Sequence, residues 1–183
     1  MPPKARITKE MILDTVLDLT RKQGFESVNA RSIAAQLRCS TQPIFTCYAN
    51  MEEMKREFLT FAYAFYENYV QRYGQTFQGD PCLVLPLSYI AFAQQETHVF
   101  QLLFVHDMEL DMAEAKDFYR EAGNGTKAEA FAKALGLPVE QGRRVFLDLF
   151  FYAHGIAVLS AAGKVALQQE TGEKMVASLL SAL

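Results

Sequence analysis

The stretch with the clearest chemical pattern is NARSIAAQLRCSTQPIFTCYANMEEM, residues 29 to 54. It contains two short runs with helical period, 30–37 and 41–48, which are separated by a turn of three residues. Ala34 is small at the place where the two runs must cross closely, and Ile44 closes the other side of the core between them. This spacing predicts a helix-turn-helix, in which the first helix braces a second helix that enters the major groove of DNA.

The outward positions of the second run carry small or polar side chains, namely Thr41, Gln42, Thr46 and Cys47. A glutamine amide pairs with two groups on the edge of adenine, and a threonine hydroxyl bonds to bases or phosphates. The side chains of the second run therefore fit a helix that contacts base edges.

Residues 8 to 60 resemble the DNA-binding domain of TetR-family transcriptional regulators. The family pattern is roughly T-x-x-x-I-A-x-x-x-G-V-S-x-x-x-L-Y-x-H-F-x-x-K-x-x-L. The chain matches it at Ile33, Ala34, Ser40, Ile44, Phe45, Tyr48 and Met54. The preceding helix, the Gly24–Phe25 pair and the long helix after Asn50 match as well.

The resemblance implies a ligand-responsive repressor that binds a palindromic operator in double-stranded DNA as a homodimer, with activation as the other sense of regulation. The DNA-binding residues that it implies are Arg31, Ser40, Thr41, Gln42, Phe45, Thr46, Tyr48 and Lys55.

Three positions depart from the family pattern. Arg38 replaces the glycine of the turn, which predicts a left-handed backbone at some strain. Phe45 replaces a tyrosine that contacts phosphate in the family, and Met51 replaces a lysine. Both changes predict weaker phosphate contact, which Arg31, Arg38 and Lys55 could offset.

The rear of the chain resembles the family's dimer-forming and effector-binding bundle. Residues 143 to 163 (RRVFLDLFFYAHGIAVLSAAG) are apolar nearly all round, so this helix must be buried on several sides. Asp148 and His154 argue against a membrane span here. The predicted dimer interface consists of Phe146, Phe150, Ala157, Val176, Leu179 and Leu180.

Aromatic side chains recur through the middle of the chain, and each is read either as core packing or as the wall of a cavity. Effector cavities are largely apolar with a few oriented polar groups. The predicted pocket residues are Tyr66, Phe92, Phe104, Met108, Tyr152 and His154, and the expected effector is small and largely apolar.

Helical period and capping residues predict an all-α chain without strands. The expected helices cover 8–23, 30–37, 41–48, 50–73, 81–96, 99–105, 113–121, 127–135, 139–162 and 171–183, with Asn29 and Ser40 as N-caps of the second and third. We expect an N-terminal three-helix helix-turn-helix domain over 1–50. A long helix joins it to a helical bundle over 51–183 for effector binding and dimerisation.

The charge distribution supports this division. The chain of 183 residues has a net charge of −3, but residues 1 to 60 carry 9 basic and 7 acidic side chains, a net of +2. Residues 61 to 183 carry 9 and 14, a net of −5. A mildly basic front and an acidic rear indicate two parts with different partners.

The remaining motifs exclude several other classes. Three cysteines without zinc spacing and the lack of a secretion signal predict a cytoplasmic protein. The three histidines are far apart, and no motif of nucleophilic, phosphate-binding or dinucleotide chemistry is present. We therefore expect no enzyme activity, cofactor, metal or membrane partner. The alternative to a regulator is a helical small-molecule-binding module that has lost DNA binding.

Overall fold

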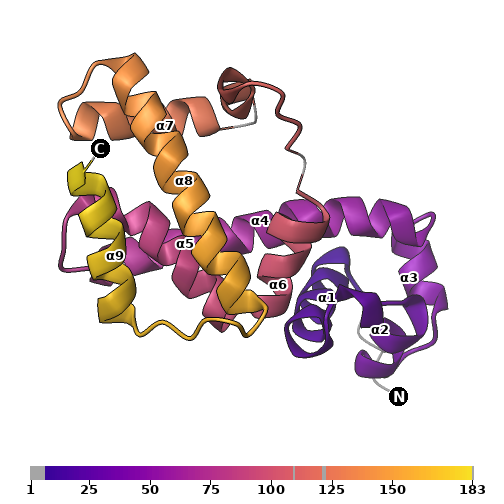
Figure 1. Cartoon of the computed structure of the whole chain (residues 1–183). Coiled ribbons are helices and arrows are strands. Elements are labelled where there is room, and N and C mark those ends of the chain that lie inside the picture. The colour runs from indigo at the N-terminus through magenta and orange to yellow at the C-terminus, as the bar shows by residue number, and fades with distance from the viewer. Residues whose placement is uncertain (1–6, 109, 121–122, 183) are drawn as a thin grey trace.

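The computed structural model describes residues 7–108, 110–120 and 123–182, and within these ranges every regular element is helical. The first four elements form a head at one end of the molecule (Figure 1). They are α1 (Lys9–Gln23), the short 3₁₀ turn η1 (Phe25–Ser27), α2 (Ala30–Gln36) and α3 (Gln42–Cys47).

The other elements form the body. They are α4 (Met51–Thr76), η2 (Pro81–Leu83), α5 (Val84–Gln95), α6 (Thr97–Gln101), the π-helical turn η3 (Leu102–His106), η4 (Ala115–Arg120), α7 (Asn124–Ala134), α8 (Val139–Ala161) and α9 (Gln169–Ala182). The fold therefore agrees with the predicted all-α class, although the predicted helix 99–105 is split between α6 and η3. The predicted helix 113–121 is shorter and of the 3₁₀ type.

Local capping explains where the head helices begin. The Asn29 side chain accepts hydrogen bonds from the backbone N–H groups of Arg31 and Ser32, and the Ser32 hydroxyl accepts one from the Asn29 N–H. The predicted cap at Asn29 is thus confirmed. The predicted cap at Ser40 is wrong, because Thr41 precedes α3 directly and its side chain makes no capping bond.

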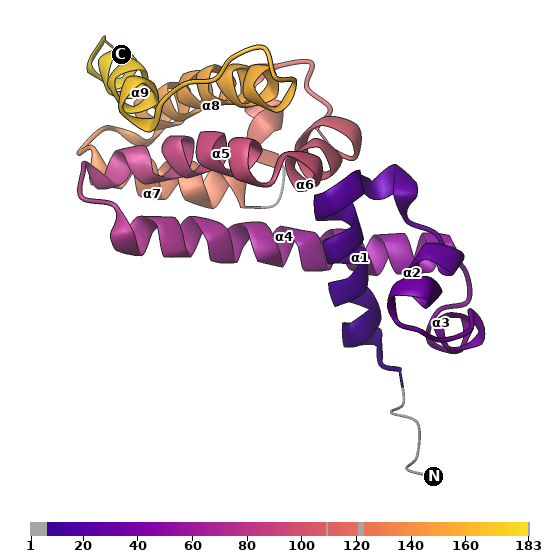
Figure 2. The same ribbon diagram turned by 90° about the horizontal axis from the view of Figure 1, so that it is seen from below.

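Helix α4 starts at a second capping pair. The Asn50 side chain accepts from the Glu53 N–H at 2.9 Å, and the Glu53 carboxylate accepts from the Ala49 N–H at 2.7 Å. From this start the helix runs 26 residues without a break, from the head into the body (Figure 2). Its first turns belong to the core of the head, since Phe58 is fully buried and stacks on Phe25.

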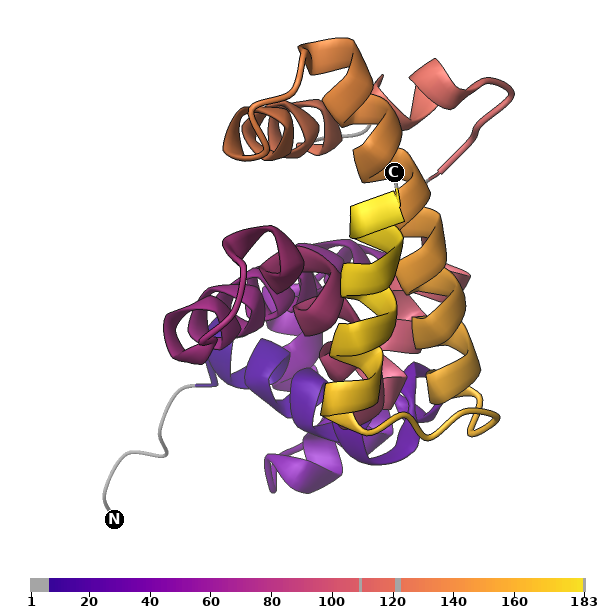
Figure 3. The same ribbon diagram turned by 60° about the vertical axis from the view of Figure 1, so that its left-hand side comes forward.

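The body is layered around α5. Helix α4 lies on one side of α5, and α8 and α9 lie on the other, while α7 packs on α8 (Figure 2). Both α8 and α9 contact α5, and they lie side by side at the edge of the body (Figure 3). Most of α5 is therefore buried, including the Ser88 hydroxyl, which donates to the Leu85 carbonyl.

Candidate nucleic-acid interface and ligand cavity

The outward side of α3 is formed by Gln42, Phe45 and Thr46, which are all exposed. These positions are spaced i, i+3 and i+4, so they lie on one side of the helix. Ile44 points the other way and is fully buried against Ile33 in the head core. The structure thus presents most of the predicted reading side chains on one surface, while Thr41 is half-buried beside them.

Two residues predicted on this surface are turned away from it. The Tyr48 side chain is only 2% exposed, and Lys9 lies over its ring at 4.6 Å. Tyr48 is therefore part of the head core in this structure and does not lie on the exposed surface of α3. Cys47 is half-buried, with its sulfur facing the carbonyl of Ile7.

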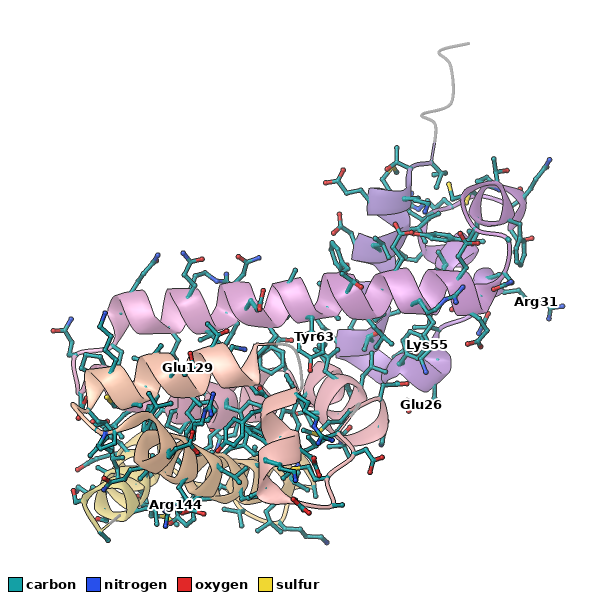
Figure 4. All side chains as sticks on the ribbon, turned by 90° about the horizontal axis from the view of Figure 1, so that it is seen from above. Glu26, Arg31, Lys55, Tyr63, Glu129 and Arg144 are labelled. Atoms are coloured by element: carbon teal, nitrogen blue, oxygen red, sulfur yellow. The ribbon has the colours of Figure 1, made fainter. Side chains whose placement is uncertain are left out.

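Lys55 is also engaged elsewhere. Its ammonium group lies 2.7 Å from a carboxylate oxygen of Asp107 and 5.7 Å from the centre of the Phe25 ring. Figure 4 shows Lys55 near Glu26, on the side of the head that meets the body. Its predicted DNA contact is therefore replaced here by an ion pair between head and body.

The stretch of sequence that contains α3 carries positive charge. No acidic residue occurs from Ser27 to Met51, whereas Arg31 and Arg38 lie in this stretch. Both arginines are exposed, and neither forms an ion pair within the described ranges. Figure 4 shows Arg31 pointing away from the head into solvent. Ser40, in the turn between α2 and α3, is exposed on the same part of the head.

Arg38 has a φ of +52°, the one positive value outside glycine among the described residues. The predicted left-handed turn at this position is therefore confirmed. An L-residue in this region carries a steric cost of about 1–2 kcal/mol. The turn between α2 and α3 thus keeps a charged side chain at the expense of stability.

A second candidate site is a cavity of about 620 Å³ within the body, between α4, α5, α7 and α8. Its walls are mainly aromatic. Tyr66 lies 4.9 Å from Phe104 between ring centres, and Phe118 lies 4.7 Å from Phe150. A volume and lining of this kind fit a drug-sized apolar ligand.

The structure brings some of the predicted pocket residues to this cavity. Tyr66, Phe104 and Met108 line it. Phe92, Tyr152 and His154 lie outside the lining. Phe92 is fully buried in the core behind Tyr66, and Tyr152 is half-buried on α8.

His154 lies one layer behind the cavity wall. Its Nδ1 is 2.9 Å from the hydroxyl of Tyr89, and Tyr89 itself lines the cavity. Burial lowers the pKa of the His154 ring, and burial raises the pKa of the Tyr89 phenol. Both groups are therefore neutral at neutral pH, and His154 supports a wall residue.

Sequence reasoning missed several wall residues and placed two of them elsewhere. Tyr89, Phe118 and Phe131 line the cavity and were not predicted. Phe146 and Phe150 also line it, although they were predicted at the dimer interface. The sequence signal that groups these two rings is their spacing of four residues on α8, which puts both on one face of that helix.

The cavity has a polar rim. Arg56, Thr60 and Glu67 contribute from α4, and Asn124 and Lys127 contribute from α7 on the opposite side. Figure 4 shows Tyr63 on α4 pointing toward the body. The rim gives a largely apolar ligand a few polar groups that can orient it.

One part of the cavity wall also touches the head. Asp107 lines the cavity and forms the ion pair with Lys55, and it follows directly after η3. A second ion pair joins head and body. Arg21 of α1 makes a bidentate ion pair with Glu96, and both hydrogen bonds measure 2.7 Å. The segment that walls the cavity is thus bonded to the head.

The outer face of α8 differs from the predicted interface. Ala157 and Val176 are fully buried within the chain, and Leu179 and Leu180 are half-buried. Of the predicted interface residues, Ala157 and Val176 are thus packed inside the chain, and Phe146 and Phe150 line the cavity. The exposed stripe of α8 consists of Arg144, Asp148, Phe151, Gly155 and Leu159.

This stripe is apolar at its centre. Phe151 is 51% exposed and Leu159 is 48% exposed, and a Cβ built on Gly155 between them would meet open space. Arg144, toward the start of the stripe, lies on the side of the body away from α4 (Figure 4). Exposed apolar residues of this kind are typical of interaction surfaces.

Helix α8 is the one described helix that is long and apolar enough to cross a membrane, with a mean hydropathy of 1.4. It packs against α5, α6, α7 and α9, which accounts for much of its apolar composition. In the described ranges, no group of three His, Cys, Asp or Glu side chains is placed to hold a metal.

No family model matches the sequence, and no curated protein sequence matches it. The structure, however, is similar to solved structures along nearly its whole length. One is a TetR-like transcriptional regulator from Rhodococcus sp. RHA1, with a TM-score of 0.65 and 14% identity over 99% of this chain and 96% of that chain.

A second similar structure is the ketosteroid transcriptional regulator KstR2 of Mycobacterium tuberculosis. Its TM-score is 0.54 and its identity 12%, over 95% of this chain and 93% of that chain. The chain therefore has the fold of TetR-like transcriptional regulators, with a helix-turn-helix head on a helical body.

Proposed function

We propose that this protein is a transcriptional regulator that binds double-stranded DNA through α3 and responds to a small apolar effector in the body cavity. The observation that carries the proposal is the surface of α3. It is exposed, lacks acidic residues, is flanked by Arg31 and Arg38, and stands on a helix-turn-helix. Such a helix fits the major groove, and the arginines suit the phosphates on either side. The likeness to regulators of the same fold supports the proposal.

We propose further that the protein acts as a homodimer through the outer face of α8. A two-fold interface uses the same patch on both subunits, and the exposed stripe of Phe151, Gly155 and Leu159 offers such a patch. Gly155 lets two helices approach closely at its centre, because it has no side chain there. A dimer with two heads would read the two halves of a palindrome.

The ion pair between Lys55 and Asp107 supports a route from effector to head. A ligand that fills the cavity changes the surroundings of Asp107, because this carboxylate belongs to the cavity wall. The effector shifts the equilibrium of the head only if it binds one arrangement of the wall more tightly than another. We propose that the protein releases DNA when the effector binds.

Selection of binding sites from random double-stranded DNA with the purified full-length protein tests the proposal. We expect a motif of two inverted half-sites whose centres lie about one helical turn or a multiple apart. The matched variants are Gln42→Ala on α3 and Gln36→Ala on α2, since both remove an exposed amide from the head. Gln42→Ala should lose most of the selectivity, and Gln36→Ala should keep it.

Salt dependence supplies the second measurement. Arg31→Ala should weaken binding to all sequences and reduce the salt slope by about one, as expected for a phosphate contact. Lys133→Ala removes an exposed cation from α7 and should change neither quantity. If no selected sequence binds above random DNA, the alternative of a small-molecule-binding module without DNA recognition is favoured.

A further inference from the structure

Phe45 is the large apolar side chain that the described part of the head leaves most exposed. Phe45 is 49% exposed on the outward side of α3, beside Gln42 and Thr46. The other large apolar residues of the helix-turn-helix, Ile33 and Ile44, are fully buried. About half of the ring is thus open to solvent and available to a partner of α3.

The chemistry of this surface restricts what it can recognise. A phenyl ring donates no hydrogen bond to a phosphate or a base. The Thr46 hydroxyl donates to the Gln42 carbonyl at 3.0 Å, so Thr46 offers a methyl group and an acceptor oxygen but no free proton. Gln42 is thus the outward residue of α3 with free donor groups, and Phe45 and Thr46 together form an apolar patch.

The major groove has one prominent apolar feature, the 5-methyl group of thymine. Phenyl rings and threonine methyl groups contact it, and a glutamine amide pairs with adenine N6 and N7. All three outward residues of α3 therefore favour A·T pairs. None of them is a cation suited to guanine, whose O6 and N7 groups are usually bound by arginine or lysine.

We propose that Phe45 is a specificity residue that reads the 5-methyl group of thymine, and that Gln42 reads a neighbouring adenine. The half-site core is then made of A·T pairs. This inference rests on the proposed DNA-binding function and deepens it, because it names the base-edge chemistry that the head recognises.

The surroundings of Phe45 favour DNA over a protein as its partner. The stretch from Ser27 to Met51 has no carboxylate, and Arg31 and Arg38 flank α3 as exposed cations. An apolar side chain in a stretch that carries cations and no carboxylate suits a thymine-bearing groove bordered by phosphates. A protein-binding role for the ring is an outcome that the experiment below can return.

Uracil substitution tests the proposal, because uracil in place of thymine removes the methyl group and keeps the base-pairing edge. The full-length protein is titrated at fixed salt against its selected duplex and against duplexes with one thymine at a time replaced by uracil. At one position in each half-site, we expect about threefold to tenfold weaker binding, the size of one lost buried methyl contact. Binding of Phe45→Ala should be weaker overall and unaffected by that same substitution.

Met11→Ala is the matched control, because Met11 is an exposed large apolar residue of the same head but lies on α1. It should keep the full uracil sensitivity of the unsubstituted protein. Circular dichroism checks that Phe45→Ala remains folded, as expected for a residue with half of its surface in solvent.

Two results would overturn the inference. The first is a selected core rich in G·C pairs, and the second is a uracil penalty of equal size in Phe45→Ala and the unsubstituted protein. A ring that binds a protein would give a Phe45→Ala variant with unchanged DNA affinity, which also contradicts the inference. These results differ from failure of the proposed function, in which no duplex is selected at all.

Discussion

At the residue scale, the turn of the helix-turn-helix contains an arginine where the backbone favours glycine. Arg38 has a φ of +52° and an exposed guanidinium group beside α3. The structure thus combines a strained backbone with a cation on the proposed DNA-binding surface. Strained positions of this kind persist where the surrounding structure holds them and are often functional.

Replacing Arg38 separates these two effects. Arg38→Gly should raise the free energy of unfolding by up to about 1 kcal/mol, because glycine adopts a positive φ without a steric cost. The same variant should bind DNA less tightly and with a smaller salt slope. Urea denaturation and DNA titration measure the two quantities.

Arg31→Gly is the matched comparison, because it removes the same charge from a helical position in α2. It should lower the free energy of unfolding by about 1 kcal/mol, since glycine is unfavourable within a helix. If both variants lose stability equally, Arg38 is not strained in the folded protein.

His154 gives a residue-scale prediction about pH. Burial among Tyr89, Phe100 and Phe150 lowers the pKa of its ring below the ordinary 6.5, so the unfolded chain binds this proton more readily than the folded chain. The stability that depends on a neutral His154 is present above about pH 6.5 and is lost as the pH falls below that value.

The measurement is the free energy of unfolding at about pH 7.5 and about pH 5.5, on either side of the ordinary histidine pKa. The loss of stability between the two should be larger for the unsubstituted protein than for His154→Gln, whose side chain does not titrate. Equal losses in the two proteins would contradict a buried, neutral histidine.

At the scale of elements, the cavity has polar side chains on both α4 and α7. Thr60 is an exposed residue of its lining, and Ala35 is an exposed residue of α2 in the head, outside the lining. The two positions offer a matched pair for blocking the cavity. A tryptophan at Thr60 would occupy part of the cavity, and a tryptophan at Ala35 would lie in the head.

The probe is N-phenyl-1-naphthylamine, a neutral aromatic compound whose fluorescence rises in apolar surroundings. Thr60→Trp should weaken its binding by about tenfold, or ~1.4 kcal/mol, while Ala35→Trp should leave the affinity unchanged. Equal affinities in the two variants would show that the probe binds elsewhere on the protein.

The predictable elements of this fold are those whose ends are set by residues close to them in the sequence. Asn29 and Asn50 cap their helices through bonds to residues two or three positions ahead, so a short stretch of sequence contains the whole cause. The head followed from these caps and from the spacing of its apolar residues. The outward side of α3 was predictable for the same reason, except at Cys47 and Tyr48, whose side chains face Ile7 and Lys9 at the start of the described chain.

The cavity was less predictable, because it is formed by contacts between distant segments. Helix α8 is apolar nearly all round, so its sequence has no polar side to show which face meets solvent. Phe146 and Phe150 were therefore assigned to the outer face, although they line the cavity. The walls from Tyr89, Phe118 and Phe131 depend on how α5, η4 and α7 pack on α8, which no local pattern indicates.

At the scale of the whole molecule, the proposed dimer depends on the exposed stripe of α8. Phe151→Asp and Leu159→Asp place charges in the centre of this stripe, where a partner helix would bury them without a partner charge. Both variants should sediment as monomers at equilibrium under conditions in which the unsubstituted protein is a dimer.

Val139→Asp is the control for this experiment. Val139 is 47% exposed on the same helix, but it lies at the first turn and off the stripe. This variant should remain dimeric. A dimer that survives both Phe151→Asp and Leu159→Asp would exclude the α8 stripe as the interface.

The unbroken course of α4 has a mechanical consequence. About 15 residues separate the cavity wall at Tyr66 from the start of the helix at Met51, which is a lever arm of about 22 Å at 1.5 Å per residue. A tilt of about ten degrees at the cavity end would move the head end by about 4 Å over that length. In a dimer, two opposite tilts would change the distance between the heads by about 8 Å, a large mismatch against a fixed half-site spacing of about 34 Å. A small angular change beside a ligand is therefore sufficient to set whether both heads fit one DNA duplex.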